Sequence, residues 1–142
     1  LSIDNPFEPE RCTPDAAAPL AGKRRFPSAV FDVLDCRELR CFHLFGGYAD
    51  RLLRLGPGLA VAAEQCGDTL LLHELLCDRP VDWETLAARL PFRNIRRVEF
   101  GFPPDRLGVE FGWEAPPEPE HLFLRGGWDL PENFCIPAFA VT

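Results

Sequence analysis

The sequence predicts a mixed α/β fold of the α+β class, with a mostly antiparallel twisted sheet, one parallel crossover pair of strands and two to three helices. Three apolar runs of six to eight residues follow one another over residues 50–76, separated only by turn residues. A capped helical stretch then leads to an alternating run at residues 95–102. The first pattern predicts an antiparallel meander, and the second predicts a strand–helix–strand crossover.

The composition is that of one globular domain. The chain has 142 residues, of which 46% are hydrophobic, and this is enough for a single core. Its net charge is −7 and its basic residues are scattered, so it lacks the basic surface that nucleic-acid binding requires. No apolar run reaches the ~18 residues that span a bilayer. We therefore expect a cytoplasmic protein with neither nucleic-acid nor membrane partners.

Six cysteines lie in the chain without the density of a disulfide-stapled scaffold. No two of them have the C-x-x-C spacing of a zinc site. We therefore expect buried free thiols and no metal site.

Residues 1–27 contain five prolines and little hydrophobic periodicity. This pattern predicts an irregular arm or linker before a domain at residues 28–142. Because the chain begins at Leu1 and contains no methionine, we expect either that its start has been processed away or that it is a piece of a longer protein. A short strand is expected at residues 28–34.

A first helix is expected to begin at Cys36. Asp35 and Glu38 have the spacing of a capping box, in which each side chain satisfies a backbone donor at the start of a helix. The helix should end at Gly46-Gly47. Its apolar stripe is expected to contain Leu39, Phe42 and His43.

The three runs that follow predict the centre of the sheet. They cover residues 50–55, 59–65 and 69–76, with turns at 56–58 and 66–68. The third run is apolar except for His73 and Glu74, as expected for a strand that is covered on both faces.

A second helix and a parallel strand are expected after the meander. Asp82 can cap a helix from Trp83 to Leu90, whose apolar face contains Leu86, Ala87 and Leu90. The alternating run at 95–102 should pair in parallel with 69–76, because a crossover helix lies between them. Further strands are expected at the ranges 109–114, 121–126 and 134–142.

Two long segments carry a resemblance to a known family. Residues 66–102 read CGDTLLLHELLCDRPVDWETLAARLPFRNIRRVEFGF, and the chain ends in HLFLRGGWDLPENFCIPAFAVT. Both resemble the C-terminal portion of bacterial proteins of the GNAT acetyltransferase superfamily, over about residues 48–142. The resemblance implies a GNAT-like domain in which strands 69–76 and 95–102 splay apart to form the coenzyme cleft.

The loop after the third strand departs from the family pattern. In active GNAT domains this loop reads Q/R-x-x-G-x-G/A, and its backbone amides hold the coenzyme A pyrophosphate. Here residues 77–82 contain no glycine, one proline and two carboxylates, and Arg79 is the single favourable group. The departure implies a half that does not bind the coenzyme in the usual mode.

Glu74 and His73 are the catalytic candidates that the resemblance implies. Glu74 lies on the strand where many GNAT enzymes place a carboxylate that deprotonates the acceptor amine. Because successive strand residues face opposite sides, we expect only one of the two to face any given cleft. Either residue could instead make a hydrogen bond within a sheet layer. Tyr48 comes too early in the chain to be the tyrosine that protonates the departing thiolate in this family.

Three hypotheses remain open from the sequence. The first is a non-coenzyme-binding half that packs on an N-terminal catalytic domain or on a second copy and shapes the acceptor pocket. The second is a divergent N-acetyltransferase that moves acetyl from acetyl-CoA to a small-molecule or peptide amine, with Glu74 as base and Arg79 at the pyrophosphate. The third is an unrelated α+β binding module with a cleft between the strands that contain Leu72 and Val98. Antiparallel pairing of these two strands would favour this hypothesis.

Overall fold

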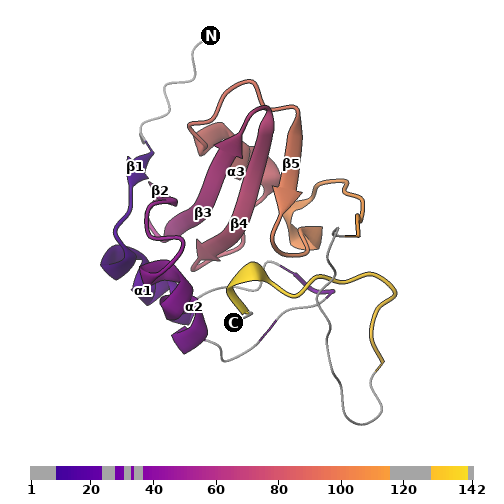
Figure 1. Cartoon of the computed structure of the whole chain (residues 1–142), viewed down its shortest axis with the longest axis horizontal. Helices are drawn as coiled ribbons and strands as arrows, with labels where there is room; N and C mark the ends of the chain where they lie inside the picture. Colours follow the sequence, from indigo (N-terminus) through magenta and orange to yellow (C-terminus); the bar gives the residue numbers. More distant parts are fainter. Residues whose placement is uncertain (1–8, 24–27, 31–32, 34–36, 116–128, 141–142) are drawn as a thin grey trace.

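The computed structural model describes residues 9–23, 28–30, 33, 37–115 and 129–140. Within them the chain forms an α+β domain with one five-stranded sheet, in the order β1-β2-β3-β4-β5, and three α-helices (Figure 1). The predicted fold class is confirmed at this level. The elements are β1 (Glu10–Arg11), α1 (Pro14–Lys23), α2 (Arg37–Phe45), β2 (Leu52–Gly56), β3 (Leu59–Cys66), β4 (Thr69–Cys77), α3 (Trp83–Arg89), β5 (Arg97–Phe100) and the 3-10 helices η1 (Asp105–Leu107) and η2 (Ala138–Ala140).

The predicted meander is confirmed. Strands β2, β3 and β4 pair antiparallel in sequence order. Gly58 and Gly67 lie in the two turns with φ of +67° and +64°, a backbone conformation that favours glycine. At Gly58 a side chain would also collide with the carboxylate of Asp78.

The predicted crossover is confirmed as well. Strand β5 pairs in parallel with β4, from Thr69 opposite Arg97 to Leu72 opposite Phe100. Helix α3 lies between them in the sequence, and Asp82 caps it as expected. Leu86 and Leu90 are buried, but Ala87 is exposed, so the predicted apolar face is narrower than expected.

The two faces of the sheet have separate cores, because alternate residues of β3 point to opposite sides. On one face Val61 and its neighbours pack against Leu86 and Leu90 at helix α3, which lies behind the sheet in Figure 1. On the other face Ala60 and Ala62 pack against helices α1 and α2. These small side chains allow the helices to approach the sheet closely.

The expectation of an irregular arm is wrong for residues 10–23, which form β1 and α1. Thr13 accepts a hydrogen bond from the amide of Ala16 through its hydroxyl (3.3 Å), and Pro14 occupies the first helical position, where no amide donor is needed. Ala17 and Ala21, one turn apart, are buried against the sheet. Pro14 therefore marks a helix start, and Pro19 lies within the helix, so these prolines do not indicate a linker. Residues 1–8 and 24–27 lie outside the described part.

Helix α2 is described from Arg37, and its predicted start, Cys36, lies outside the described residues. Within the expected apolar stripe Leu39 and His43 are partly buried, but Phe42 is 66% exposed and the prediction is wrong there. The buried positions are Arg40 and Leu44, and Arg40 lies beside a carboxylate of the sheet. Asp35, the expected cap, lies outside the described residues.

The remaining predicted strands are absent from the part of the chain that the structure describes. Residues 28–30 and 33 are not in a strand, 109–114 are irregular, and the described part of 134–142 contains only η2. Phe139 of η2 is fully buried, and its ring lies 4.6 Å from that of Tyr48. Burial of this ring holds the segment against the sheet and α2 without strand pairing. The range 121–126 is outside the described residues.

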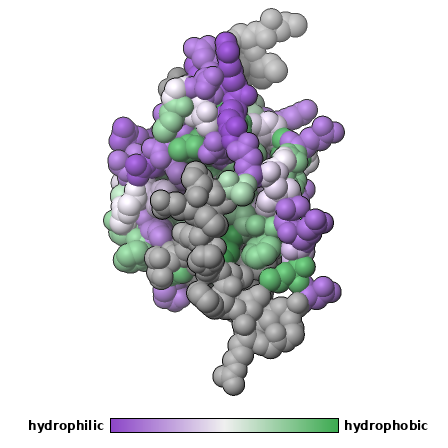
Figure 2. Space-filling view, turned by 45° about the vertical axis from the view of Figure 1, so that its right-hand side comes forward, coloured by the Kyte–Doolittle hydropathy of each residue, from purple (hydrophilic) through white to green (hydrophobic). Residues whose placement is uncertain are grey.

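The five described cysteines are free thiols, as predicted. The expected burial is confirmed for Cys12 and Cys77, whereas Cys41 and Cys135 are partly buried and Cys66 is exposed. Cys36 lies outside the described residues. None of the helices in the described part combines the length and the apolar character needed to cross a bilayer. Figure 2 shows hydrophilic residues at the top of the view and along both sides, with apolar areas between them.

Candidate functional site

The two catalytic candidates, His73 and Glu74, lie at an irregularity in strand β4. Ala62 of β3 pairs with Glu74, but the next residue, Ala63, pairs with Leu72. His73 is therefore the extra residue of a β-bulge and has no partner in the register.

The bulge places both side chains on the same face of the sheet. The His73 ring lies 4.9 Å from that of Tyr48, which packs against the core under α1 and α2. The Glu74 carboxylate lies beside Arg40 of α2. The expectation that only one of the two residues could face a given side is wrong, since a bulge interrupts the alternation on which it rested.

Glu74 is 0% exposed. Its Oε2 lies 3.9 Å from Nε of Arg40, and its Oε1 accepts a hydrogen bond from the amide of Leu75 (2.9 Å). Arg40 in turn donates from Nη2 to the carbonyl of Val33 (2.8 Å). This buried ion pair ties β4 to α2, and in this arrangement the carboxylate is closed to solvent.

His73 belongs to a more open cluster. Its Nε2 lies 2.9 Å from Oε1 of Glu64, whose Oε2 accepts from Nε of Arg51 at 2.8 Å. The hydrogen bond from Arg51, and secondly that with His73, holds the pKa of Glu64 below its ordinary value. The same contact with Glu64 raises the pKa of Arg51. With the His73 side chain 19% exposed, this histidine–carboxylate pair has the composition of an acid–base site.

The place where β4 and β5 part is filled by the chain itself. Ladder pairing ends at Leu72, whose carbonyl accepts from the amide of Gly101 (2.8 Å), and Gly101 accepts from the amide of Ala138 (2.8 Å). A β carbon on Gly101 would lie 2.6 Å from the carbonyl oxygen of His73. Phe102 and Phe139 are buried in the cores on the two faces of the sheet. In the described residues, side chains and η2 therefore pack the end of this strand pair.

The loop after β4 carries one carboxylate at the start of α3 and a second beside the β2–β3 turn. Asp82 accepts a hydrogen bond from the amide of Thr85 through Oδ1 (2.8 Å). This backbone hydrogen bond lowers the pKa of Asp82. Asp78 lies against Gly58 of the preceding turn. The α3 terminus is thus already occupied by a carboxylate of the chain.

Arg79, the predicted coenzyme contact, projects from this loop toward the β2–β3 turn. It donates from Nη2 to the carbonyl of Pro57, and its Nε lies 3.7 Å from Oδ1 of Asp78. Its side chain is 64% exposed. Arg79 is therefore positioned by the turn and not by α3.

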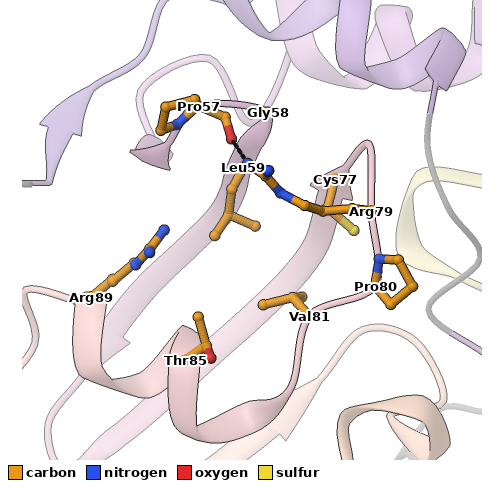
Figure 3. Close-up of a pocket in the computed structure, with 9 residues that line it drawn as sticks. All are labelled: Pro57, Gly58, Leu59, Cys77, Arg79, Pro80, Val81, Thr85 and Arg89. Atoms are coloured by element: carbon orange, nitrogen blue, oxygen red, sulfur yellow. Dashed lines mark hydrogen bonds between the residues drawn. The ribbon is translucent and has the colours of Figure 1, made fainter.

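A pocket of about 280 Å³ lies between the β2–β3 turn, the end of β4 and helix α3 (Figure 3). Arg89 of α3 reaches into it and donates from Nη1 to the carbonyl of Leu55 (3.3 Å). Thr85 and Arg89 are four residues apart and share one helix face, but this spacing alone gave no signal for a site. The lining residues are Pro57, Gly58, Leu59, Cys77, Arg79, Pro80, Val81, Thr85 and Arg89.

The described residues contain no group of three or more His, Cys, Asp or Glu side chains that could hold a metal ion. Comparisons of the chain with protein-family models, with curated proteins and with solved structures found no match. The site is therefore interpreted from its own geometry, and membership of the GNAT superfamily stays a prediction.

Proposed function

We propose that this domain is the non-coenzyme-binding half of a GNAT-like N-acetyltransferase, which packs on a catalytic domain or shapes the acceptor pocket. The observation that carries the proposal is the state of the loop between β4 and α3. Asp82 caps α3 and accepts from the amide of Thr85, so a carboxylate takes the position at which a pyrophosphate would be bound.

The electrostatics of this loop support the same conclusion. Asp82 lies at the position that a pyrophosphate needs, and like charges at short range repel. Asp78, the second carboxylate of the loop, lies against Gly58 of the β2–β3 turn. Pro80 removes one amide donor from the loop. Arg79 points to Pro57 on the other side. The loop therefore offers neither the amide donors nor the positive charge that coenzyme binding in the usual mode requires.

The sheet favours a GNAT-like arrangement over an unrelated binding module. Strands β4 and β5 pair in parallel and are connected through α3. The antiparallel pairing that would favour the unrelated module is not observed. Phe42 and Phe45 on α2 are 66% and 53% exposed, and they offer apolar surface to a partner domain.

Titration of the isolated chain with acetyl-CoA in a calorimeter tests the proposal. We expect no saturable heat and no rise in the unfolding temperature, because a ligand stabilises a protein only when it binds the folded state. The double variant Asp78→Asn with Asp82→Asn removes both negative charges from the loop. Titrated in the same way, it shows how far these charges affect acetyl-CoA binding. Saturable binding of acetyl-CoA to the unaltered chain would contradict the proposal.

A second candidate is a divergent N-acetyltransferase that acts on a small-molecule or peptide amine. It is favoured by the bulge, which brings His73 and Glu74 to one face, and by the contact of His73 with Glu64. Acetyl transfer to a panel of amines is the measurement. If this second candidate is correct, Glu74→Gln removes the base and should lower the rate of acetyl transfer to every amine. An unchanged rate would count against the mechanism.

A further inference from the structure

The pocket beside α3 contains two arginines that come from different elements. Figure 3 shows Arg79 reaching in from the end of β4 and Arg89 from α3, with Leu59 between them. The guanidinium of Arg79 donates to the carbonyl of Pro57 in the β2–β3 turn, and that of Arg89 donates to the carbonyl of Leu55 near the end of β2. The fold therefore brings two positive charges to one concave surface of a protein whose net charge is −7.

The charge of Arg89 is not balanced by a carboxylate in the described part of the chain. Its hydrogen-bond acceptor there is the neutral carbonyl of Leu55, and the residue is half-buried. A guanidinium has five N–H donors, so most of them stay available to a ligand. Partial burial of a charge is costly unless an opposite charge accompanies it. An anion in the pocket would supply that charge.

The size and the remaining lining restrict the anion. A volume of about 280 Å³ is below the usual range for drug-sized ligands, which starts at ~300 Å³. Leu59, Val81 and two prolines form apolar walls, and Thr85 contributes a hydroxyl. The carboxylate of Asp78 lies nearby and pairs with Arg79, which leaves Arg89 as the stronger contact.

We propose that this pocket binds a small organic oxyanion, with its charged head between Arg89 and Arg79 and its short apolar body against Leu59 and Val81. Carboxylates are planar and phosphate monoesters are tetrahedral, but both present oxygens that accept hydrogen bonds from the guanidinium fork. The site is separate from the proposed role as a non-coenzyme-binding half, since it uses side-chain guanidinium groups and not the amides at the start of α3.

An NMR titration of the whole chain with butyrate, methyl phosphate and uncharged butyramide tests this site. Saturable shifts of the Val81 and Thr85 amides are expected with at least one of the two anions and not with butyramide. In Arg89→Gln the dissociation constant should rise by about tenfold or more, which reflects loss of a charge-assisted contact. In Arg79→Gln it should rise by about threefold, because that side chain is more exposed.

Arg93→Gln is the matched control, since Arg93 is exposed and lies outside the pocket lining. It makes the same change in net charge and should leave the affinity unchanged. Thermal unfolding of each variant checks that it is folded, and Arg89→Lys retains the charge without the fork if Arg89→Gln is unstable.

The proposal is overturned if neither anion gives saturable shifts, if butyramide binds equally well, or if all three glutamine variants weaken binding to the same degree. The last result would mean that net charge alone attracts the anion. A parallel titration with acetyl-CoA reports on the proposed function separately. Binding of acetyl-CoA that persists in Arg89→Gln would contradict the proposed function and leave the pocket standing. Failure of the small anions to bind would overturn the pocket and leave the proposed function standing.

Discussion

The two faces of the sheet are built on different principles. The face under α3 is made of leucine, valine and phenylalanine side chains that interlock with Leu86 and Leu90. The face under α1 and α2 combines alanines with charged groups, among them the buried pair of Arg40 and Glu74. Hydrophobic periodicity describes the first face well. The second depends on contacts between residues far apart in the sequence, and these have no local pattern.

The largest expected effect comes from breaking the buried ion pair. Glu74→Ala leaves the charge of Arg40 buried without its partner and should lower the free energy of unfolding by about 3–5 kcal/mol. Urea unfolding monitored by circular dichroism measures the change.

A double variant separates the charge from the packing. Arg40→Met with Glu74→Leu removes both charges and keeps apolar volume, so it should recover most of the lost stability. If Glu74→Ala loses less than about 1 kcal/mol, the pair does not hold this face together and the contrast between the faces disappears.

On the face under α3 the corresponding test is Leu86→Ala. Leu86 is fully buried, so the variant creates a cavity and should lower the free energy of unfolding by about 3 kcal/mol. In contrast to the ion pair, this loss should not be recovered by a second substitution. Ala87→Ser on the same helix is the control. Ala87 is exposed, and a change there should stay within about 0.5 kcal/mol. Equal losses in the two variants would mean that α3 does not pack through Leu86.

The sequence predicted the parts of the fold that depend on local patterns. The meander, the cap at Asp82 and the parallel crossover follow from turn residues, capping residues and alternation, and all three are observed. Helix α1 differs from the predicted irregular arm. Thr13 and Pro14 form a helix start, but five prolines within residues 1–27 are also typical of irregular chain, so the local pattern is ambiguous.

The candidate site was less predictable. The sequence indicates His73 and Glu74 as candidates, but both side chains lie on the same face of the sheet because of a bulge that no residue type predicts. Arg40 could not be identified, because a charged residue on a helix is usually exposed and only its contact with Glu74 explains its burial. Arg89 required knowledge that the β2–β3 turn folds back against α3.

A smaller effect is expected from the α3 cap. Asp82→Ala removes the hydrogen bond to the amide of Thr85 and should lower the unfolding temperature by a few degrees. The pKa of Asp82 is lowered by folding, so its contribution is complete above the ordinary carboxyl pKa and is lost as the pH falls through the lowered value. Thermal unfolding at neutral and acidic pH should show the difference shrinking in acid. Asp82→Asn, which can still cap, should lose less, and equal losses in both variants would argue against capping.

The smallest expected effect tests the open cluster on the face under α1 and α2. Glu64→Gln weakens the contacts with Arg51 and His73, and at this partly exposed position the loss should stay below about 1 kcal/mol. Folding lowers the pKa of Glu64, so its charge stabilises the protein above the ordinary glutamate pKa and ceases to do so as the pH falls through the lowered value. Urea unfolding of both proteins across the acidic range should therefore converge at low pH. Breaking the buried pair of Arg40 and Glu74 should give a far larger loss at neutral pH, because solvent does not screen it. A Glu64→Gln loss as large as that of Glu74→Ala would show that the cluster and the buried pair act as one unit.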